Sequence, residues 1–108
     1  MKYVRLKKNG DFQKLFKKGK KAYSKLLTVI YVPCKGKTVM GIALSKKHGK
    51  AVKRNRIKRL IRAAFSNNLE RLNGSYSLVI LPRICPEYSY ADVEKNLLSC
   101  FKAMEKAK

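Results

Sequence analysis

The side chains best suited to chemistry are the cations between residues 49 and 72, where no acid appears before Glu70. The cations that precede Glu70 are Lys50, Lys53, Arg54, Arg56, Lys58, Arg59 and Arg62. An arginine guanidinium can hold two phosphate oxygens at once. Like charges four apart on a helix repel one another, so an uncompensated row favours an anion from outside as its partner. The run predicts a polyanion-binding surface; the alternative is an ordinary solvent-exposed helix of a basic protein.

Apolar residues in the same stretch recur at the spacing of one helix face. Arg54, Lys58 and Arg62 then follow one another at four-residue intervals along one flank, and Asn55 and Arg59 lie on the opposite side. A helix here would pack on a core and hold its cations outward. The apolar face consists of Ile57, Leu60, Ile61, Ala64 and Phe65.

Overall charge agrees with a nucleic-acid-binding protein. The chain has 27 Lys plus Arg against 6 Asp plus Glu, a net charge of +21 and a pI near 10.3. Such a balance, with the cations clustered, is typical of nucleic-acid binders. Hydrophobic residues make up 45% of the chain, which is enough for one core. We expect a single RNA-binding domain over residues 1–108, with residues 1–8 as a flexible basic arm.

Several function classes lack support. No apolar run approaches the roughly 18 residues of a membrane span, and no signal-peptide core precedes the first basic residues, so we expect a cytoplasmic protein without membrane contact. The cysteines show no Cys-x-x-Cys spacing and His48 stands alone, which disfavours structural zinc and predicts reduced thiols. The six acids are scattered, so we assign no catalytic residue and no metal site, and His48 receives no catalytic role.

Local patterns predict an order α-β-β-α-β-α, with room for one more short strand. Asn9 is a plausible cap for a first helix that Gly19 ends. Gly41 within a strand indicates a bulge or a close approach by another group. Two of the strands are expected to pair as an antiparallel hairpin, and the last strand to be covered on both faces. The predicted elements are a helix over 10–18, strands over 25–32 and 38–44, the basic helix, a strand over 76–81 and a final helix begun by a capping pattern at Ser89.

Two phenylalanines on the first helix allow two interpretations. Phe12 and Phe16 lie one turn apart, so they can pack in the core. One ring can instead border a groove where an unpaired base stacks. On the strand over residues 25–32, Val29 and Tyr31 share one face with Leu27.

The stretch SKKHGKAVKRNRIKRLIRAAF, residues 45–65, resembles the signature of the bacterial ribonuclease P protein subunit. Arg54-Asn55-Arg56 corresponds to the RNR motif of that family. The likeness extends to LKKNGDFQKLFKKG over residues 6–19 and to the GIALSKK segment. Lys50 and Ala63 depart from the residues that the family often has there.

The resemblance implies a fold that spacing does not determine. The family has a small α/β fold, an α+β two-layer sandwich like a ribosomal protein domain, with a sheet of about four strands. Its long basic helix lies in a left-handed crossover, whereas most such connections are right-handed.

The resemblance also implies a function. A ribonuclease P RNA subunit with bound Mg²⁺ would hydrolyse a phosphodiester at the 5′ end of precursor tRNA, and this chain would assist without catalysing and without another protein partner. A cleft between the first helix and the sheet would receive the single-stranded 5′ leader, with Phe12, Phe16, Val29 and Tyr31 at the matching positions. The RNA-binding residues would be Lys46, Lys47, Lys53, Arg54, Asn55, Arg56, Lys58, Arg59 and Arg62.

Two other functions fit parts of the sequence. A ribosomal or RNA-chaperone protein would show the same basic charge. A self-sufficient nuclease is disfavoured, because metal-assisted phosphoryl chemistry needs convergent carboxylates.

Overall fold

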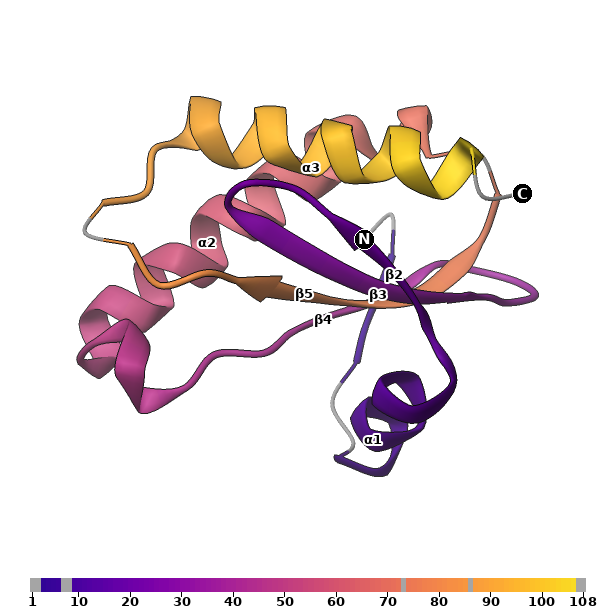
Figure 1. The fold of residues 1–108 in the computed structure, drawn as a ribbon, viewed down its shortest axis with the longest axis horizontal. Coiled ribbons are helices and arrows are strands. Elements are labelled where there is room, and N and C mark those ends of the chain that lie inside the picture. The colour runs from indigo at the N-terminus through magenta and orange to yellow at the C-terminus, as the bar shows by residue number, and fades with distance from the viewer. Residues whose placement is uncertain (1–2, 7–8, 73, 86, 107–108) are drawn as a thin grey trace.

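A computed structural model describes residues 3–6, 9–72, 74–85 and 87–106 of the chain (Figure 1). It contains five strands, three α-helices and two short 3₁₀ helices in this part of the chain. In order they are β1 (Val4–Arg5), α1 (Asn9–Lys18), β2 (Lys20–Tyr23), β3 (Leu27–Pro33), β4 (Val39–Ile42), η1 (Lys46–His48), α2 (Ala51–Asn68), η2 (Leu69–Arg71), β5 (Tyr76–Pro82) and α3 (Tyr90–Lys106).

The strands form one sheet in the order β1-β4-β5-β3-β2. β3 is antiparallel to both β2 and β5, whereas β4 is parallel to β5 and to β1. The antiparallel hairpin predicted for residues 25–32 and 38–44 is therefore wrong: both strands exist, but β5 lies between them. The almost continuous apolar run of β5 suits this central position, because its side chains are covered on both faces.

The sheet has five strands where about four were expected. The two strands that local patterns did not predict, β1 and β2, are short and lie at the two edges of the sheet. Their exposed Arg5, Lys20 and Lys21 weaken the apolar signal, and such charges are typical of sheet edges, where they discourage pairing with other chains.

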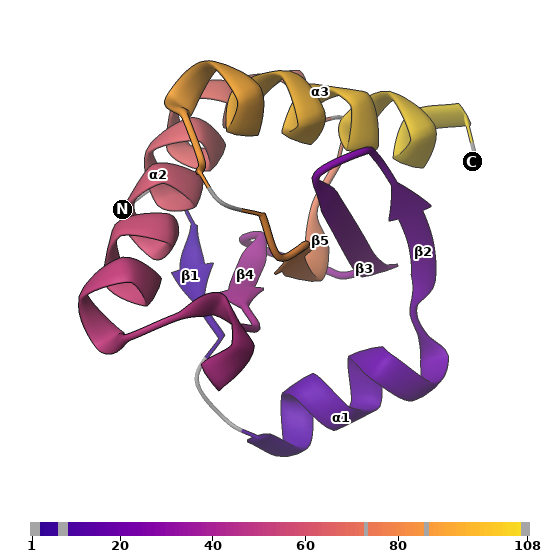
Figure 2. The same ribbon diagram turned by 60° about the vertical axis from the view of Figure 1, so that its left-hand side comes forward.

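Helices cover both faces of the sheet. α2 and α3 pack against one face, and α1 lies against the other (Figure 2). The larger core lies under α2 and α3, where Phe65 meets Phe101 edge to face with ring centroids 5.9 Å apart. A smaller cluster joins Leu15 of α1 to Ile30 and Val79 of the sheet. The expected α+β sandwich is thus confirmed, with α1 added on its outer face.

The first described residues belong to the fold. Tyr3 is only 6% exposed, and its ring meets Phe65 edge to face at 4.9 Å. The backbone N–H groups of Val4 and Leu6 donate to the carbonyls of Thr38 and Met40, at 2.9 and 3.0 Å. The flexible arm predicted for residues 1–8 is wrong for residues 3–6, and the rest of that range lies outside the described residues.

α2 is the crossover between the parallel neighbours β4 and β5, which puts the basic helix beside the sheet (Figure 1). The left hand implied by the family resemblance stays a prediction. The first helix ends at Gly19 as expected. A Cβ there would come within 2.4 Å of Ile30 and 2.6 Å of the Leu15 carbonyl, so only glycine lets the chain turn into β2. Within the described part of the chain, none of the helices is both long and apolar enough to cross a lipid bilayer.

Candidate nucleic-acid interface

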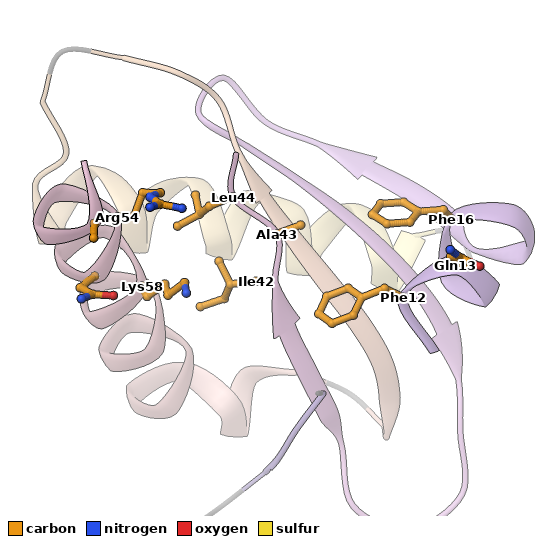
Figure 3. Close-up of a pocket in the computed structure, with 10 residues that line it drawn as sticks. Phe12, Gln13, Phe16, Ile42, Ala43, Leu44, Arg54 and Lys58 are labelled. Carbon is orange, nitrogen blue, oxygen red and sulfur yellow. The ribbon is translucent and has the colours of Figure 1, made fainter. Parts of the chain in front are cut away.

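A groove of about 570 Å³ runs between α1 and α2 over the end of β4. Figure 3 shows Phe12 and Phe16 on one side of it and Arg54 and Lys58 on the other. Residues at and after the end of β4 lie between these walls. The other lining residues are Gln13, Ile42, Ala43, Leu44, Ala51 and Asn55.

The aromatic wall depends on a glycine in the sheet. A Cβ on Gly41 would lie 2.8 Å from a carbon of the Phe12 ring, closer than real contacts allow. Phe12 can therefore rest on β4 only because residue 41 has no side chain, which is the close approach predicted from the sequence. Phe16, one turn later, is 44% exposed and leaves its ring open to the groove.

The cationic wall is one flank of α2. Arg54, Lys58 and Arg62 stand at four-residue intervals, which corresponds to a rise of about 6 Å per step. Lys58 and Arg62 also line an adjoining hollow of about 210 Å³ that reaches Arg5 on β1. A row of three cations therefore follows one continuous edge from the groove toward β1.

Arg54 is held in the groove without a partner of its own. Its Nε is buried and has no hydrogen-bond partner among the described residues. Figure 3 shows the guanidinium directed toward Leu44, and the Lys58 amine toward Ile42, on the floor of the groove. Because a buried polar group without a hydrogen bond is costly, this arrangement favours an anionic ligand that would engage the guanidinium.

His48 fixes the start of the basic helix to the sheet. The Pro82 carbonyl can only accept, so His48 Nε2 donates to it at 2.7 Å, and Nδ1 accepts from the Ser45 backbone N–H at 3.1 Å. The imidazole thereby engages both of its nitrogens and joins the η1 turn to the end of β5. Sequence patterns did not indicate this role, since its shortest hydrogen bonds are to backbone groups and the Ser45 hydroxyl lies 3.4 Å from Nδ1.

The predicted RNA-binding residues do not share one surface. Asn55 lines the groove with Arg54 and Lys58, so its predicted place on the opposite side of the helix is wrong, while Arg59 is exposed on the outer side of α2. Lys46 and Lys47 are exposed on η1. Lys53 and Arg56 project from the other flank of α2, toward the segment before α3.

Two of the four predicted cleft residues lie on the wrong face of the sheet. Val29 is 0% exposed and Tyr31 is 4% exposed, and both belong to the core beneath α2 and α3. Tyr31 meets Tyr76 edge to face at 5.7 Å, and burial is the main cause that raises its pKa above 10.0. The prediction paired them with Phe12 and Phe16, but α1 covers the opposite face of β3, where Ile30 contacts Leu15.

Sequence reasoning also missed the floor of the groove. Ile42, Ala43 and Leu44 come from the end of β4 and the segment after it, which the sequence placed only in a strand. Gly41 was the one available signal, because a glycine inside a strand marks a close approach.

The carboxylates that the structure describes do not gather into a metal site. Among the described residues no three His, Cys, Asp or Glu side chains converge as metal ligands would. Glu94 accepts hydrogen bonds from Asn68 and Tyr90, which lower the pKa of its carboxyl below 4.5. The side chains described here therefore do not fit Mg²⁺, and no step is assigned to a metal on this protein.

The sequence matches the family model described as Ribonuclease P over residues 1–105. The chain belongs to the ribonuclease P protein family. The ribonuclease P protein component of Alkaliphilus oremlandii is 38% identical over 103 residues, which cover 93% of this chain and 90% of that protein. The family resemblance read from residues 45–65 is thereby confirmed, and the chain is the protein subunit of a ribonucleoprotein that processes precursor tRNA by endonucleolytic cleavage.

Solved ribonuclease P proteins share the fold. The Staphylococcus aureus ribonuclease P protein superposes with a TM-score of 0.84 at 30% identity, covering 96% of this chain and 97% of that one. The Thermotoga maritima protein gives a TM-score of 0.82 at 28% identity, covering 92% and 96%. An RNA partner follows from membership of the ribonuclease P family.

Proposed function

We propose that the groove between α1 and α2 receives the single-stranded 5′ leader of precursor tRNA, while other cations of α2 and η1 bind the ribonuclease P RNA. The observation that carries this proposal is the pairing of an exposed aromatic ring, Phe16, with a cationic row across one open groove. An unpaired strand offers base faces and phosphates together, and single-strand binding sites combine the same two features.

Each wall has its own part in this proposal. Phe16 stacks on a leader base, while Phe12 sits on Gly41 and supports the wall. Arg54, Lys58 and Arg62 contact successive phosphates, because their spacing of about 6 Å is close to that of an extended strand. The leader then passes from the aromatic wall toward Arg5. This chain thereby binds and orients the substrate and moves no proton.

Charge explains the assistance to the RNA subunit. Precursor and ribozyme are both polyanions, and a chain with a net charge of +21 placed between them offsets their repulsion. Mg²⁺ bound by the RNA supplies the hydrolytic chemistry. We expect this subunit to work in the cytoplasm, to need no second protein and to lower the Mg²⁺ concentration that the RNA requires. Cleavage by the protein alone, after rigorous removal of contaminating nucleases, would contradict this proposal.

The test uses the reconstituted holoenzyme with precursor tRNA and with mature tRNA, which lacks the leader. Phe16→Ala removes an open ring and should weaken precursor binding by about tenfold, because stacking contributes roughly 1–3 kcal/mol per base. Binding of mature tRNA should scarcely change.

Tyr31→Ala is the matched control, since it removes another aromatic ring, but one that is buried in the core. It should lower the free energy of unfolding by about 3–5 kcal/mol, as large-to-small core changes do. Any loss of affinity should be equal for both ligands. If Phe16→Ala also weakens both equally, the groove does not bind the leader.

A further inference from the structure

A second hollow, of about 470 Å³, lies on the other flank of α2. Here α2 faces the segment that joins β5 to α3 and the first turn of α3. Ile57 and Leu60 form an apolar floor, and Tyr88 and Tyr90 contribute two aromatic side chains. Its volume is within the range of small-ligand sites, which are typically 300–1,000 Å³.

Both tyrosines are fixed by their hydroxyl groups. The Tyr90 hydroxyl accepts from Asn67 Nδ2 at 2.7 Å and donates to Glu94 Oε2 at 3.0 Å. The Tyr88 hydroxyl donates to the Arg83 carbonyl, and burial, assisted by Cys85, raises the pKa of Tyr88 to about 12. The hydroxyl hydrogen bonds of both tyrosines hold their rings in place before any ligand arrives, which lowers the entropic cost of binding.

The rim of this pocket carries both signs of charge. Lys53 and Arg56 project from α2, and Glu87 and Asp92 lie on the facing segment. Within the described residues, no hydrogen bond or ion pair joins these cations to these carboxylates. The groove on the other flank has cations and no acid in its lining. A surface that served phosphate alone would gain nothing from Glu87 and Asp92, because carboxylates repel phosphate.

We propose that this pocket binds one unpaired guanosine nucleotide of RNA, a role that rests on the chain's membership of an RNA-binding family. The base lies against the half-buried Tyr90 ring, since Tyr88 is only 8% exposed, and its 5′ phosphate contacts Lys53 and Arg56. The Glu87 carboxylate accepts hydrogen bonds from the guanine N1–H and N2 amino group, which lie side by side on one base edge. Uracil presents a single N–H between two carbonyl oxygens. A carboxylate repels those oxygens, so it accepts less well from uracil than from guanine.

The position of the pocket makes it independent of the leader groove. The groove is lined by residues 51, 54, 55 and 58 of α2, and the pocket by residues 53, 56, 57 and 60. At about 100° per residue these sets lie on opposite flanks of the helix. One strand in the groove cannot also fill the pocket, so α2 holds two RNA segments, one on each side.

The test titrates guanosine 5′-monophosphate and uridine 5′-monophosphate into the full-length protein and follows the backbone amide resonances by NMR. Guanosine monophosphate should shift the resonances of residues 53–60 and 87–92. Uridine monophosphate should bind at least several-fold more weakly.

Glu87→Gln separates the proposal from simple charge repulsion, because the two expect opposite changes in affinity. Under the proposal, Glu87→Gln lowers the affinity of the protein for guanosine monophosphate by about tenfold, because a hydrogen-bonded carboxylate is lost. If the acids merely repel RNA, the same change strengthens binding of every nucleotide. Glu70→Gln is the matched control: it removes the same charge from the exposed η2 turn, outside the pocket lining.

Two results would overturn the guanosine site. One is the absence of shifts around the pocket at millimolar guanosine monophosphate. The other is equal binding of both nucleotides, strengthened by Glu87→Gln. Neither depends on precursor tRNA, so failure here leaves the leader groove standing, and failure of the Phe16→Ala experiment leaves this pocket standing.

Discussion

The two flanks of α2 show how one basic helix can present two different kinds of binding site. On the groove flank, Arg54 and Lys58 face an aromatic wall with no acid in the lining. On the pocket flank, Lys53 and Arg56 face Glu87 and Asp92 across a hollow lined by fixed tyrosines. The first arrangement attracts any single strand through backbone charge and ring stacking. The second carries hydrogen-bond acceptors that can distinguish bases. Charge density alone therefore does not describe what this helix recognises.

The largest expected effect comes from a pair of double variants that remove identical charges. Arg54→Ala with Lys58→Ala should lower the affinity of the holoenzyme for precursor tRNA by about a hundredfold, since each lost contact to phosphate contributes about 1.5 kcal/mol. Lys53→Ala with Arg56→Ala removes one arginine and one lysine from the other flank. It should leave the ratio of precursor to mature tRNA affinity unchanged. Equilibrium binding across a salt series measures the affinity of each double variant for precursor and mature tRNA. If both double variants change the affinity ratio equally, the two flanks do not differ in function.

A smaller effect should follow from filling the space under Phe12. Gly41→Ala places a methyl group 2.8 Å from the ring, which should cost about 1–3 kcal/mol of stability as overpacking does. The displaced ring should weaken precursor binding and leave the guanosine titration unaltered. Urea denaturation and both binding assays measure these effects.

Gly10→Ala is the control for Gly41→Ala, because a Cβ at residue 10 would meet nothing within 4 Å. It should be neutral or slightly stabilising in the helix. If Gly41→Ala changes neither stability nor precursor binding, the contact of the Phe12 ring with Gly41 is not required.

Removal of the Tyr90 hydroxyl tests the hydrogen bonds that hold the pocket flank. Tyr90→Phe keeps the ring and removes the hydroxyl that links Asn67 to Glu94, at a cost of about 1 kcal/mol. Guanosine monophosphate should bind a few-fold more weakly, and the ratio of precursor to mature tRNA affinity should stay constant. Tyr23→Phe, on the exposed ring of β2, should change neither quantity. An altered tRNA ratio in Tyr90→Phe would show that the two flanks are coupled.

The smallest effect is a pH dependence that belongs to the pocket flank. Hydrogen bonds from Asn68 and then Tyr90 lower the folded-state pKa of Glu94 below its ordinary 4.5. Its contribution to stability is therefore complete above the unfolded-state pKa and is lost as pH falls through the lower folded-state value. The difference in unfolding free energy between wild type and Glu94→Gln should shrink from pH 7 to pH 3. A difference that grows on acidification would contradict this linkage.

Local patterns predicted elements well where one chain segment carried the signal. The apolar periodicity of Ile57, Ile61, Ala64 and Phe65 placed α2, and these four residues are buried as expected. The continuous run of β5 indicated a strand covered on both faces. The alternation in β3 separated Val29 and Tyr31 from Ile30 correctly. This alternation does not determine which face of the sheet α1 covers, because that depends on the strand order. Val29 and Tyr31 were therefore predicted on the wrong face of the sheet.

The binding surfaces were predictable only in part for the same reason. Phe12, Phe16 and Arg54 were named as site residues from composition, spacing and family resemblance, and the structure does bring them to one groove. The guanosine pocket combines α2 with residues 87–92, which no periodic pattern connects. His48 illustrates the limit for single residues, since its shortest hydrogen bonds are to backbone atoms of Ser45 and Pro82.

The central position of β5 has a consequence for how the molecule is made. β5 joins β3 to β4, yet it is the last of the strands that the structure describes, so the sheet stays in two parts until residues 76–82 have been synthesised. α3, which packs against α2 in the larger core, is synthesised later still. Long-range pairing of this kind is slow to form, and its late closure leaves the nascent chain with a basic helix but no finished interface. The leader groove and the pocket can therefore be complete only after residues 76–82 have joined the two parts of the sheet.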